Sequence, residues 1–225
     1  MTKTVTYTSY LDLERILEAQ HPASEAHDEL LFIIVHQASE LWLKLCLHEL
    51  TSARIAIEAD DLRPAFKMLS RVARAQNQLI QSWDVLSTMT PHDYSAIRPH
   101  LGASSGFQSP QYRMMEFMLG GRDQKHVRLH EKTGDWSVRL RTEIARASLY
   151  DAAIALLARR GFPIDIAVLE RDVGQSYTPD PSVEEAWASI YRDPQEHWDL
   201  YELAEKLVDL ELHFQRGRFG HFMTV

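Results

Sequence analysis

The feature that most constrains the fold is a long, uninterrupted helical pattern near the start of the chain. Apolar residues recur at intervals of three and four from residue 28 to about 58, and this spacing places them on one face of an α-helix. The same spacing returns from about 62 to 89, with Asp61 placed to cap the helix and Pro64 tolerable in its first turn. Because the connection is so short, these two helices should form an antiparallel hairpin.

Helical spacing also dominates the rest of the chain, so we predict an all-α fold in one domain over residues 1–225. No alternating run is bounded by a two-residue Gly turn, as a β-hairpin would require. Further helices are expected over 11–19, 135–147, 148–160 and 182–192, and from Pro194 to the end. Ser105 and Gln108 resemble a capping box that opens a helix ending near Gly120. Residues 90–106 are expected to be a loop with at most a short helix over 93–98, and 121–134 a surface loop.

Composition excludes several classes of protein. The 225 residues are 45% apolar and 25% charged, which is ordinary for a globular protein and excludes collagenous or disordered chains. The net charge of -8 disfavours nonspecific nucleic-acid binding. The fully apolar runs, such as 30–35, are far shorter than the roughly 20 residues of a membrane span. We therefore expect a soluble chain. Because Cys46 is the single cysteine and cannot form an internal disulfide, we also expect a cytoplasmic location.

Eleven histidines make metal binding the first chemistry to examine. Zinc-type Cys pairs, His-Glu-x-x-His and the Glu-x-x-His pairs of di-iron bundles are all missing from the sequence. Gly-rich phosphate loops and the Gly-x-Ser-x-Gly elbow are missing too. Without Cys-x-x-Cys-His, a haem would have to be held non-covalently through an axial histidine.

Two histidines and one arginine are candidate site residues. His36 shares an apolar helix face with Phe32 and Leu43, which fits either a core histidine with one hydrogen bond or an acid, base or ligand in a pocket. Near the end of the last helix, Gly217 lies one turn before His221 and leaves room for a flat cofactor, although a solvated histidine at a frayed end fits as well. Arg98 could bind a carboxylate bidentately or simply face solvent.

Three long blocks of the sequence resemble the tryptophan 2,3-dioxygenase family in order and spacing. They are HDELLFIIVHQASELWLKLCLHEL (27–50), TPHDYSAIRPHLGASSGFQSPQYR (90–113) and LVDLELHFQRGRFGHFMTV (207–225). The likeness also includes YTSYLDLERIL near the start and SLYDAAIALLARRGFPI (148–164), so it covers nearly the whole chain.

The resemblance implies a helical bundle of long antiparallel helices that encloses non-covalent haem b, in a homotetramer. It implies insertion of both atoms of O2 across the indole C2–C3 bond of L-tryptophan. The product would be N-formyl-L-kynurenine, in the first step of tryptophan catabolism through the kynurenine pathway. One alternative is a related haem monooxygenase that acts on a tryptophan derivative in biosynthesis. Another is a catalytically silent haem-binding scaffold.

The resemblance also assigns roles to individual residues. His221 matches the axial ligand of the haem iron, and His36 matches the distal histidine near the indole nitrogen. We expect His36 to hold the indole N–H rather than to act as an obligatory base. The residues placed at the substrate by the resemblance are Phe32, Ile33, Ile34, Val35, His36, Tyr94, Arg98, Leu101, Ser105, Gly106, Tyr7, Tyr10 and Leu11.

Within that set, Phe32 would pack on the indole, and Arg98 would bind the carboxylate beside Tyr94. Tyr7, Tyr10 and Leu11 belong to a strap over residues 1–20 that would reach the active site of a neighbouring subunit.

The sequence departs from the family's pattern at a few places. Gly217 stands where a Trp is common, and Val35 stands where a Gln is common. Gly220, Phe222 and Met223 also differ from the usual residues around the haem ligand. No residue of this sequence matches the family's Thr that contacts the substrate ammonium group, so either a further segment supplies it or the amino group is held differently.

Overall fold

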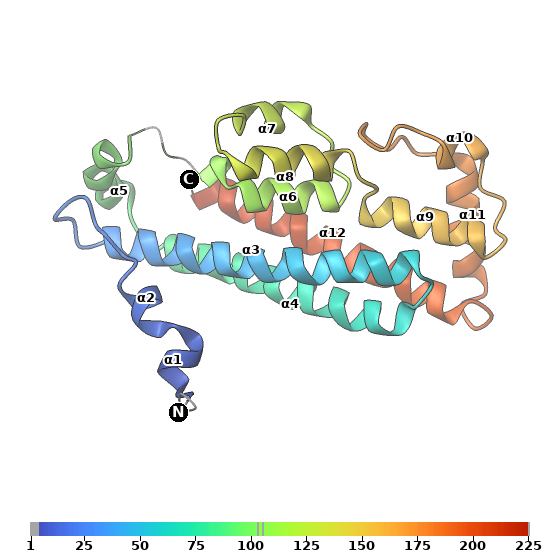
Figure 1. The fold of residues 1–225 in the computed structure, drawn as a ribbon, viewed down its shortest axis with the longest axis horizontal. Coiled ribbons are helices and arrows are strands. Elements are labelled where there is room, and N and C mark those ends of the chain that lie inside the picture. Colours follow the sequence, from blue (N-terminus) through green and yellow to red (C-terminus); the bar gives the residue numbers. More distant parts are fainter. Residues whose placement is uncertain (1–4, 103, 105, 225) are drawn as a thin grey trace.

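The computed structural model describes residues 5–102, 104 and 106–224, and every secondary-structure element in these ranges is a helix. The all-α prediction is therefore confirmed. Three long helices form the body: α3 (Glu29–Glu58), α4 (Leu62–Leu86) and α12 (Trp198–Thr224). They run side by side along the long axis of the molecule, and α4 packs against both of the others (Figure 1).

The predicted hairpin of α3 and α4 is present (Figure 1). Helices α4 and α12 instead run in the same direction, as the neighbours of two glycines in α12 show. A Cβ atom at Gly217 would lie 3.9 Å from Ile80, and one at Gly220 would lie 3.1 Å from Trp83. The later residue of α12 thus lies beside the later residue of α4. Helix α12 is therefore parallel to α4, and the C-terminal ends of the two helices lie side by side.

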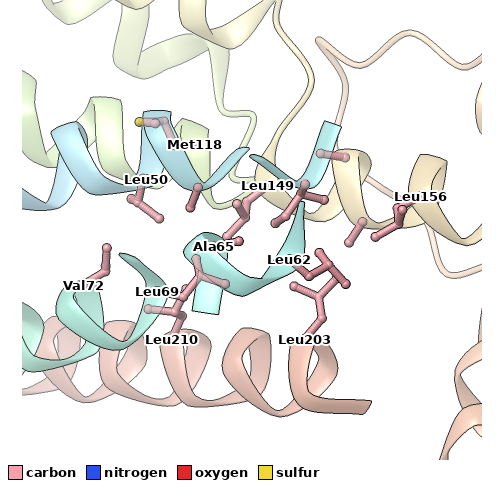
Figure 2. Packing of buried hydrophobic residues seen from close by; sticks show 14 of the residues in the cluster. Leu50, Leu62, Ala65, Leu69, Val72, Met118, Leu149, Leu156, Leu203 and Leu210 are labelled. Carbon is pink, nitrogen blue, oxygen red and sulfur yellow. The ribbon is translucent and has the colours of Figure 1, made fainter. Parts of the chain in front are cut away.

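One large apolar core holds the long helices together (Figure 2). Leu50 of α3, Leu69 of α4 and Leu203 of α12 are each completely buried in it. Burying such a side chain contributes roughly 1.5–3 kcal/mol relative to leaving it exposed. The same core includes Leu149, Ala153 and Leu156 of α9, which therefore closes the side of the bundle.

The remaining helices cover the body. They are α5 (Pro91–Ile97), η1 (Arg98–His100), η2 (Gly106–Gln108), α6 (Pro110–Met118), α7 (Gln124–Leu129), α8 (Asp135–Ile144), α9 (Leu149–Arg159), α10 (Ile166–Leu169) and α11 (Pro181–Arg192). Helix α6 packs against both α3 and α8. A second, small core of Phe117, Val127, Leu140 and Ile144 joins α6, α7 and α8.

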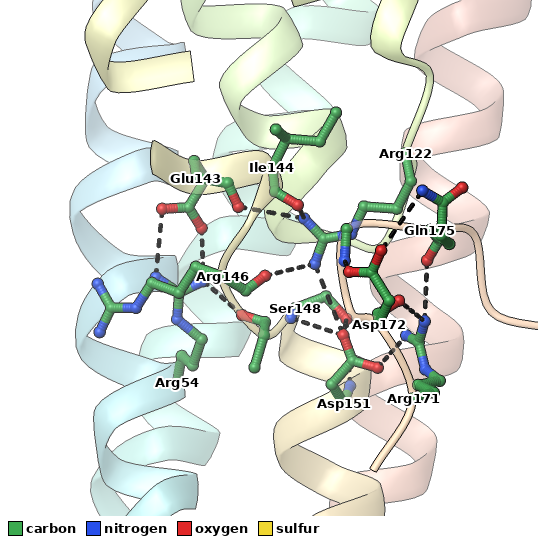
Figure 3. Close-up of polar contacts among 12 residues, drawn as sticks. Arg54, Arg122, Glu143, Ile144, Arg146, Ser148, Asp151, Arg171, Asp172 and Gln175 are labelled. Carbon is green, nitrogen blue, oxygen red and sulfur yellow. Dashed lines mark hydrogen bonds and ion pairs between the residues drawn. The ribbon is translucent and has the colours of Figure 1, made fainter. Parts of the chain in front are cut away.

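Buried ion pairs fasten α8 and α9 to this body (Figure 3). Arg54 of α3 is 1% exposed, pairs with Glu143 of α8 and donates to the Ala147 carbonyl at 2.8 Å. Arg122 donates to the carbonyls of Glu143, Ile144 and Arg146, which end α8. Asp151 of α9 accepts from Arg171 and lies 3.6 Å from Arg122. These buried charges are therefore paired, which offsets the cost of removing them from water.

The N-terminal helices α1 (Tyr7–Leu11) and α2 (Leu13–Leu17) point away from the body (Figure 1). Neither helix has a buried residue. Asp12 separates them with a φ of 51°, in the left-handed region. Tyr7 and Tyr10 are more than three-quarters exposed, so this arm has no core of its own within one chain.

Several sequence-based boundaries were wrong. Residues 121–134 are not only a loop, because Asp123 caps α7 there through its side chain. The predicted helix over 11–19 is instead two short helices, and α10 was not predicted. Asp61 makes no capping hydrogen bond. Helix α6 is capped by Ser109, while Ser105 lies outside the described residues.

Helix α3 is long and apolar enough to cross a membrane by length and composition alone. It nevertheless packs against α4, α6 and α9 and carries the buried charged residues Glu29, Glu49 and Arg54. These contacts make α3 part of the core of the helical bundle.

Candidate active site

A cavity of about 1380 Å³ opens at one end of the bundle, between α3, α4, α5, α6 and α12. This exceeds the roughly 300–1,000 Å³ of a site for one drug-sized ligand, so the cavity has room for two bound molecules. Seven of the sequence-predicted site residues line it: Phe32, His36, Tyr94, Arg98, Leu101, Gly106 and His221. These residues come from four separate segments of the chain.

His36 faces the cavity with a defined hydrogen-bonding state. Its Nδ1 lies 2.7 Å from the carbonyl oxygen of Phe32, one turn earlier on α3. Because a carbonyl only accepts, the proton of the neutral ring is on Nδ1, and Nε2 is left as an acceptor. His36 therefore has the one hydrogen bond expected of a core histidine and also lines the cavity.

Aromatic rings form one wall of the cavity. The ring centroids of Phe32 and His36 are 4.2 Å apart, and those of Phe32 and Tyr94 are 6.2 Å apart. Trp83 of α4 lies 6.2 Å from His36 and 4.8 Å from His221. Flat ring faces at these separations suit a planar ligand. Sequence reasoning missed Trp83, because its contacts with His36 and His221 join residues far apart in the chain.

His221 is half-buried near the end of α12. Burial lowers the pKa of its imidazole, and the neighbouring His36 ring and Arg113 guanidinium lower this pKa further. The ring is therefore neutral near pH 7 and keeps a nitrogen lone pair for a metal. Gly106 lies against it, since a Cβ atom there would be only 2.9 Å from Nε2 of His221.

Arg98 is an exposed cation that lines the cavity. Its Nη1 donates to the carbonyl of Gly102 at 2.8 Å. Gly102 has a backbone φ of +56°, a left-handed conformation that glycine adopts without strain and that directs its carbonyl toward Arg98. The turn holds the guanidinium beside Tyr94, whose ring lies on the same cavity. The other N–H groups of the planar guanidinium can therefore be offered to a carboxylate.

A mixed charged cluster forms the opposite wall. The Glu116 carboxylate lies 2.8 Å from Arg113, 3.2 Å from His126 and 3.9 Å from Arg218. Arg113, His126 and Arg218 line the cavity. Two guanidinium groups therefore share the Glu116 carboxylate.

Other sequence-predicted residues are placed elsewhere in the single chain. Ser105 lies outside the described residues, so its position is not described. Val35 is buried in α3, and Ile34 is 48% exposed on the outside of the same helix. Neither these two nor Ile33 is among the described residues that line the cavity. Tyr7, Tyr10 and Leu11 are exposed on the arm, and their contact with a neighbouring active site stays a prediction.

The cavity fits a metal that is carried by a macrocycle better than a bare ion. Among residues 5–102, 104 and 106–224 no group of three or more His, Cys, Asp or Glu side chains could hold a metal ion. A single neutral imidazole, His221, does face a large cavity with aromatic walls. Such a site supplies one axial ligand and apolar contacts to a flat ring, which are the elements of a non-covalent haem site.

Comparisons with known proteins point to one family. A family model described as tryptophan 2,3-dioxygenase matches residues 1–143. The chain is 72% identical over 225 residues to the tryptophan 2,3-dioxygenase of Erythrobacter litoralis (strain HTCC2594). This alignment covers all of this chain and 86% of the relative. It is 52% identical over 224 residues to tryptophan 2,3-dioxygenase 1 of Ralstonia nicotianae, with 76% of that relative covered. It is 51% identical to the tryptophan 2,3-dioxygenase of Paraburkholderia phytofirmans, with 73% covered.

These similarities extend over all the elements that build the cavity. Residues 1–143 include the cavity residues of α3, α4, α5 and α6. His221 lies beyond that range, but the relatives align over the full chain and so include α12.

Proposed function

The chain belongs to the tryptophan 2,3-dioxygenase family, and we propose that it oxidises L-tryptophan with O2 in the cavity between His36 and His221. Both atoms of O2 are inserted across the indole C2–C3 bond, and N-formyl-L-kynurenine is released into the kynurenine pathway. The observation that carries this proposal is the convergence of His36, His221 and Arg98 on one aromatic-walled cavity.

The proposed cofactor is haem b, held non-covalently with His221 as axial ligand. Bound haem would supply the iron at which O2 is activated. The lowered pKa of His221 supports this role, because an unprotonated imidazole is required of a ligand. Trp83 stands beside His221 and limits the orientations open to its ring.

Substrate recognition is assigned to the mouth of the cavity. Arg98 binds the carboxylate through its planar guanidinium, and Tyr94 lies one turn earlier on α5. Phe32 packs against the indole, since its ring lies between those of His36 and Tyr94. Fixing both ends of the substrate raises the effective molarity of the reacting pair.

His36 is assigned to the indole nitrogen. The hydrogen bond from Nδ1 to the Phe32 carbonyl leaves Nε2 as an acceptor, and the indole N–H has only a proton to donate. The two are complementary without any proton transfer. His36 therefore orients the indole, and the apolar walls around it exclude water that would divert a reactive oxygen species.

A homotetramer, a cytoplasmic location and a single domain complete the proposal. The arm of α1 and α2 has no buried residue, and Leu30, Ile34 and Leu41 are exposed on α3. Exposed apolar residues of this kind favour closed, symmetric association. The strap residues Tyr7, Tyr10 and Leu11 are thereby available to a neighbouring subunit.

The proposal is tested by adding haem to the purified chain and to a His221→Ala variant, and then by supplying L-tryptophan, reductant and air. The unchanged chain should give an axially ligated haem spectrum and N-formylkynurenine, and the variant neither. His48→Ala is the matched control, because His48 is exposed on α3 outside the cavity. An unaltered haem spectrum in His221→Ala would remove the ligand assignment, and lack of product from the loaded wild-type chain would remove the reaction.

A further inference from the structure

His130 is a buried histidine that has no part in the proposed reaction. It forms the C-terminal cap of α7 and is only 1% exposed. Within the described part of the chain neither of its ring nitrogens has a hydrogen-bond partner. A buried polar group in this condition is costly and unusual, so it calls for a functional explanation.

Neighbouring groups disfavour a positive charge on His130. Arg113 of α6 and His126 of α7 act electrostatically on His130, and both lie beside Glu116 of α6, which also faces Arg218 of α12. The Glu116 carboxylate already serves Arg113, His126 and Arg218, at distances of 2.8 to 3.9 Å.

On the α8 side, Arg141 donates to Ser137, Glu143 pairs with Arg54, and Asp135 is exposed in the first turn. Burial lowers the pKa of His130, and Arg113 and His126 lower it further. The ring is therefore neutral in the closed fold at neutral pH.

Helix α7 is held by few contacts. Of its residues 124–129 only Val127 is buried, in the small core with Phe117, Leu140 and Ile144. Lys125, Arg128 and Leu129 are exposed. In Figure 1, α7 is the outermost helix of the layer that includes α6 and α8. A short, peripheral helix with so little buried apolar surface opens at a lower free energy than the core helices.

The same helix forms part of the cavity wall. His126 of α7 lines the cavity and lies 3.2 Å from Glu116. If α7 moves away, His126 leaves Glu116 and the side of the cavity opens to water. The position of α7 and the enclosure of the cavity on this side are therefore coupled.

We propose that His130 makes α7 an acid-sensitive latch on the cavity wall. A neutral His130 stays buried and keeps α7 closed, while a protonated His130 cannot remain beside Arg113 and leaves the core together with α7. The opening is a property of the fold itself. Its consequence, loss of a water-free reaction site under acid conditions, rests on the proposed function.

The sign and size of the effect follow from proton linkage. Since the pKa of His130 is lowered in the closed fold, the open form binds the proton more tightly below the ordinary histidine pKa of about 6.5. Closure is fully stable above that pH and is lost as the pH falls. With one proton taken up on opening, the opening constant rises about tenfold for each pH unit below about 6.5.

Hydrogen–deuterium exchange of the purified full-length chain between pH 5 and 7.5 measures this directly, after correction for the intrinsic pH dependence of exchange. Amides of residues 125–130 should lose protection about tenfold per pH unit below about 6.5, while amides of α9 keep theirs. His130→Leu and the non-titrating polar variant His130→Gln should both abolish the dependence. His48→Leu should keep it, because His48 is exposed on α3.

A pH-independent α7 in the wild-type chain would overturn the proposal, as would full acid sensitivity in a folded His130 variant. The readout uses neither haem nor tryptophan, so failure of the latch and failure of the proposed reaction are observed separately. An acid-opened α7 in an inactive chain would support the latch and reject only its consequence for catalysis.

Discussion

The rings of Trp83 and His221 lie 4.8 Å apart and are inclined by 60° to each other in the middle of the cavity. This contact depends on the parallel packing of α4 and α12, where Gly220 lets the two backbones approach. A Cβ atom at residue 220 would lie 3.1 Å from Cδ1 of Trp83. The proposed axial ligand is therefore positioned by a neighbouring aromatic ring as well as by its own helix.

Trp83→Ala should weaken haem binding, because removal of the indole leaves His221 free to rotate and opens a void beside it. Trp83→Phe should retain most of the affinity. Haem titration of the purified variants measures the difference, with Trp198→Ala as control because Trp198 is 61% exposed at the start of α12. Equal affinities in Trp83→Ala and wild type would show that Trp83 does not position the ligand.

Two glycine substitutions should have opposite outcomes. Gly106→Ala places a Cβ atom 2.9 Å from Nε2 of His221, so it should displace the imidazole and reduce both haem binding and turnover. Gly217→Ala brings only an ordinary 3.9 Å contact with Ile80. It should leave the position of His221 unchanged and gain up to about 1 kcal/mol of stability from helix propensity. The check is turnover together with thermal unfolding, and full turnover in Gly106→Ala would contradict the described approach of the loop to His221.

Arg98→Ala should raise KM for L-tryptophan by roughly 10- to 100-fold, since a charged hydrogen bond is worth about 1.5–3 kcal/mol. Arg98→Lys should recover only part of the loss, because an ammonium group cannot bind a carboxylate bidentately. Steady-state kinetics separate KM from kcat, and Arg192→Ala on the surface of α11 is the control. An unchanged KM would mean that another group holds the carboxylate.

Removal of one partner of the buried Arg54–Glu143 pair should destabilise the fold by about 3–5 kcal/mol, because an uncompensated charge remains buried. Arg54→Met is one such change. Urea unfolding gives the free energy, and loss of the exposed Arg192–Glu185 pair should cost about 1 kcal/mol or less. Similar losses for the two pairs would show that the Arg54 site is solvated.

Periodicity predicted the long helices well because each of them buries a continuous apolar stripe. Leu43, Leu50 and Ile57 of α3 repeat every seven residues and are all buried. Helix α7 escaped prediction because only Val127 of its residues is buried, so its sequence carries no apolar period.

Part of the candidate site could also be predicted from the sequence. The resemblance selected His36, Arg98 and His221, and the structure brings all three to one cavity. Neither Trp83 nor the parallel direction of α12 could be predicted, since both depend on contacts between residues far apart in the chain. The resemblance also placed Val35 at the substrate, but adjacent helical residues point about 100° apart, and the Val35 side chain is buried in the bundle.

The most direct test is mass spectrometry of the product formed from L-tryptophan by the reduced, haem-loaded chain under ¹⁸O₂. Insertion of both oxygen atoms predicts N-formylkynurenine that carries two labelled atoms. A product with a single labelled atom, or no oxidised product from protein with haem confirmed bound, would contradict dioxygenation in the cavity between His36 and His221.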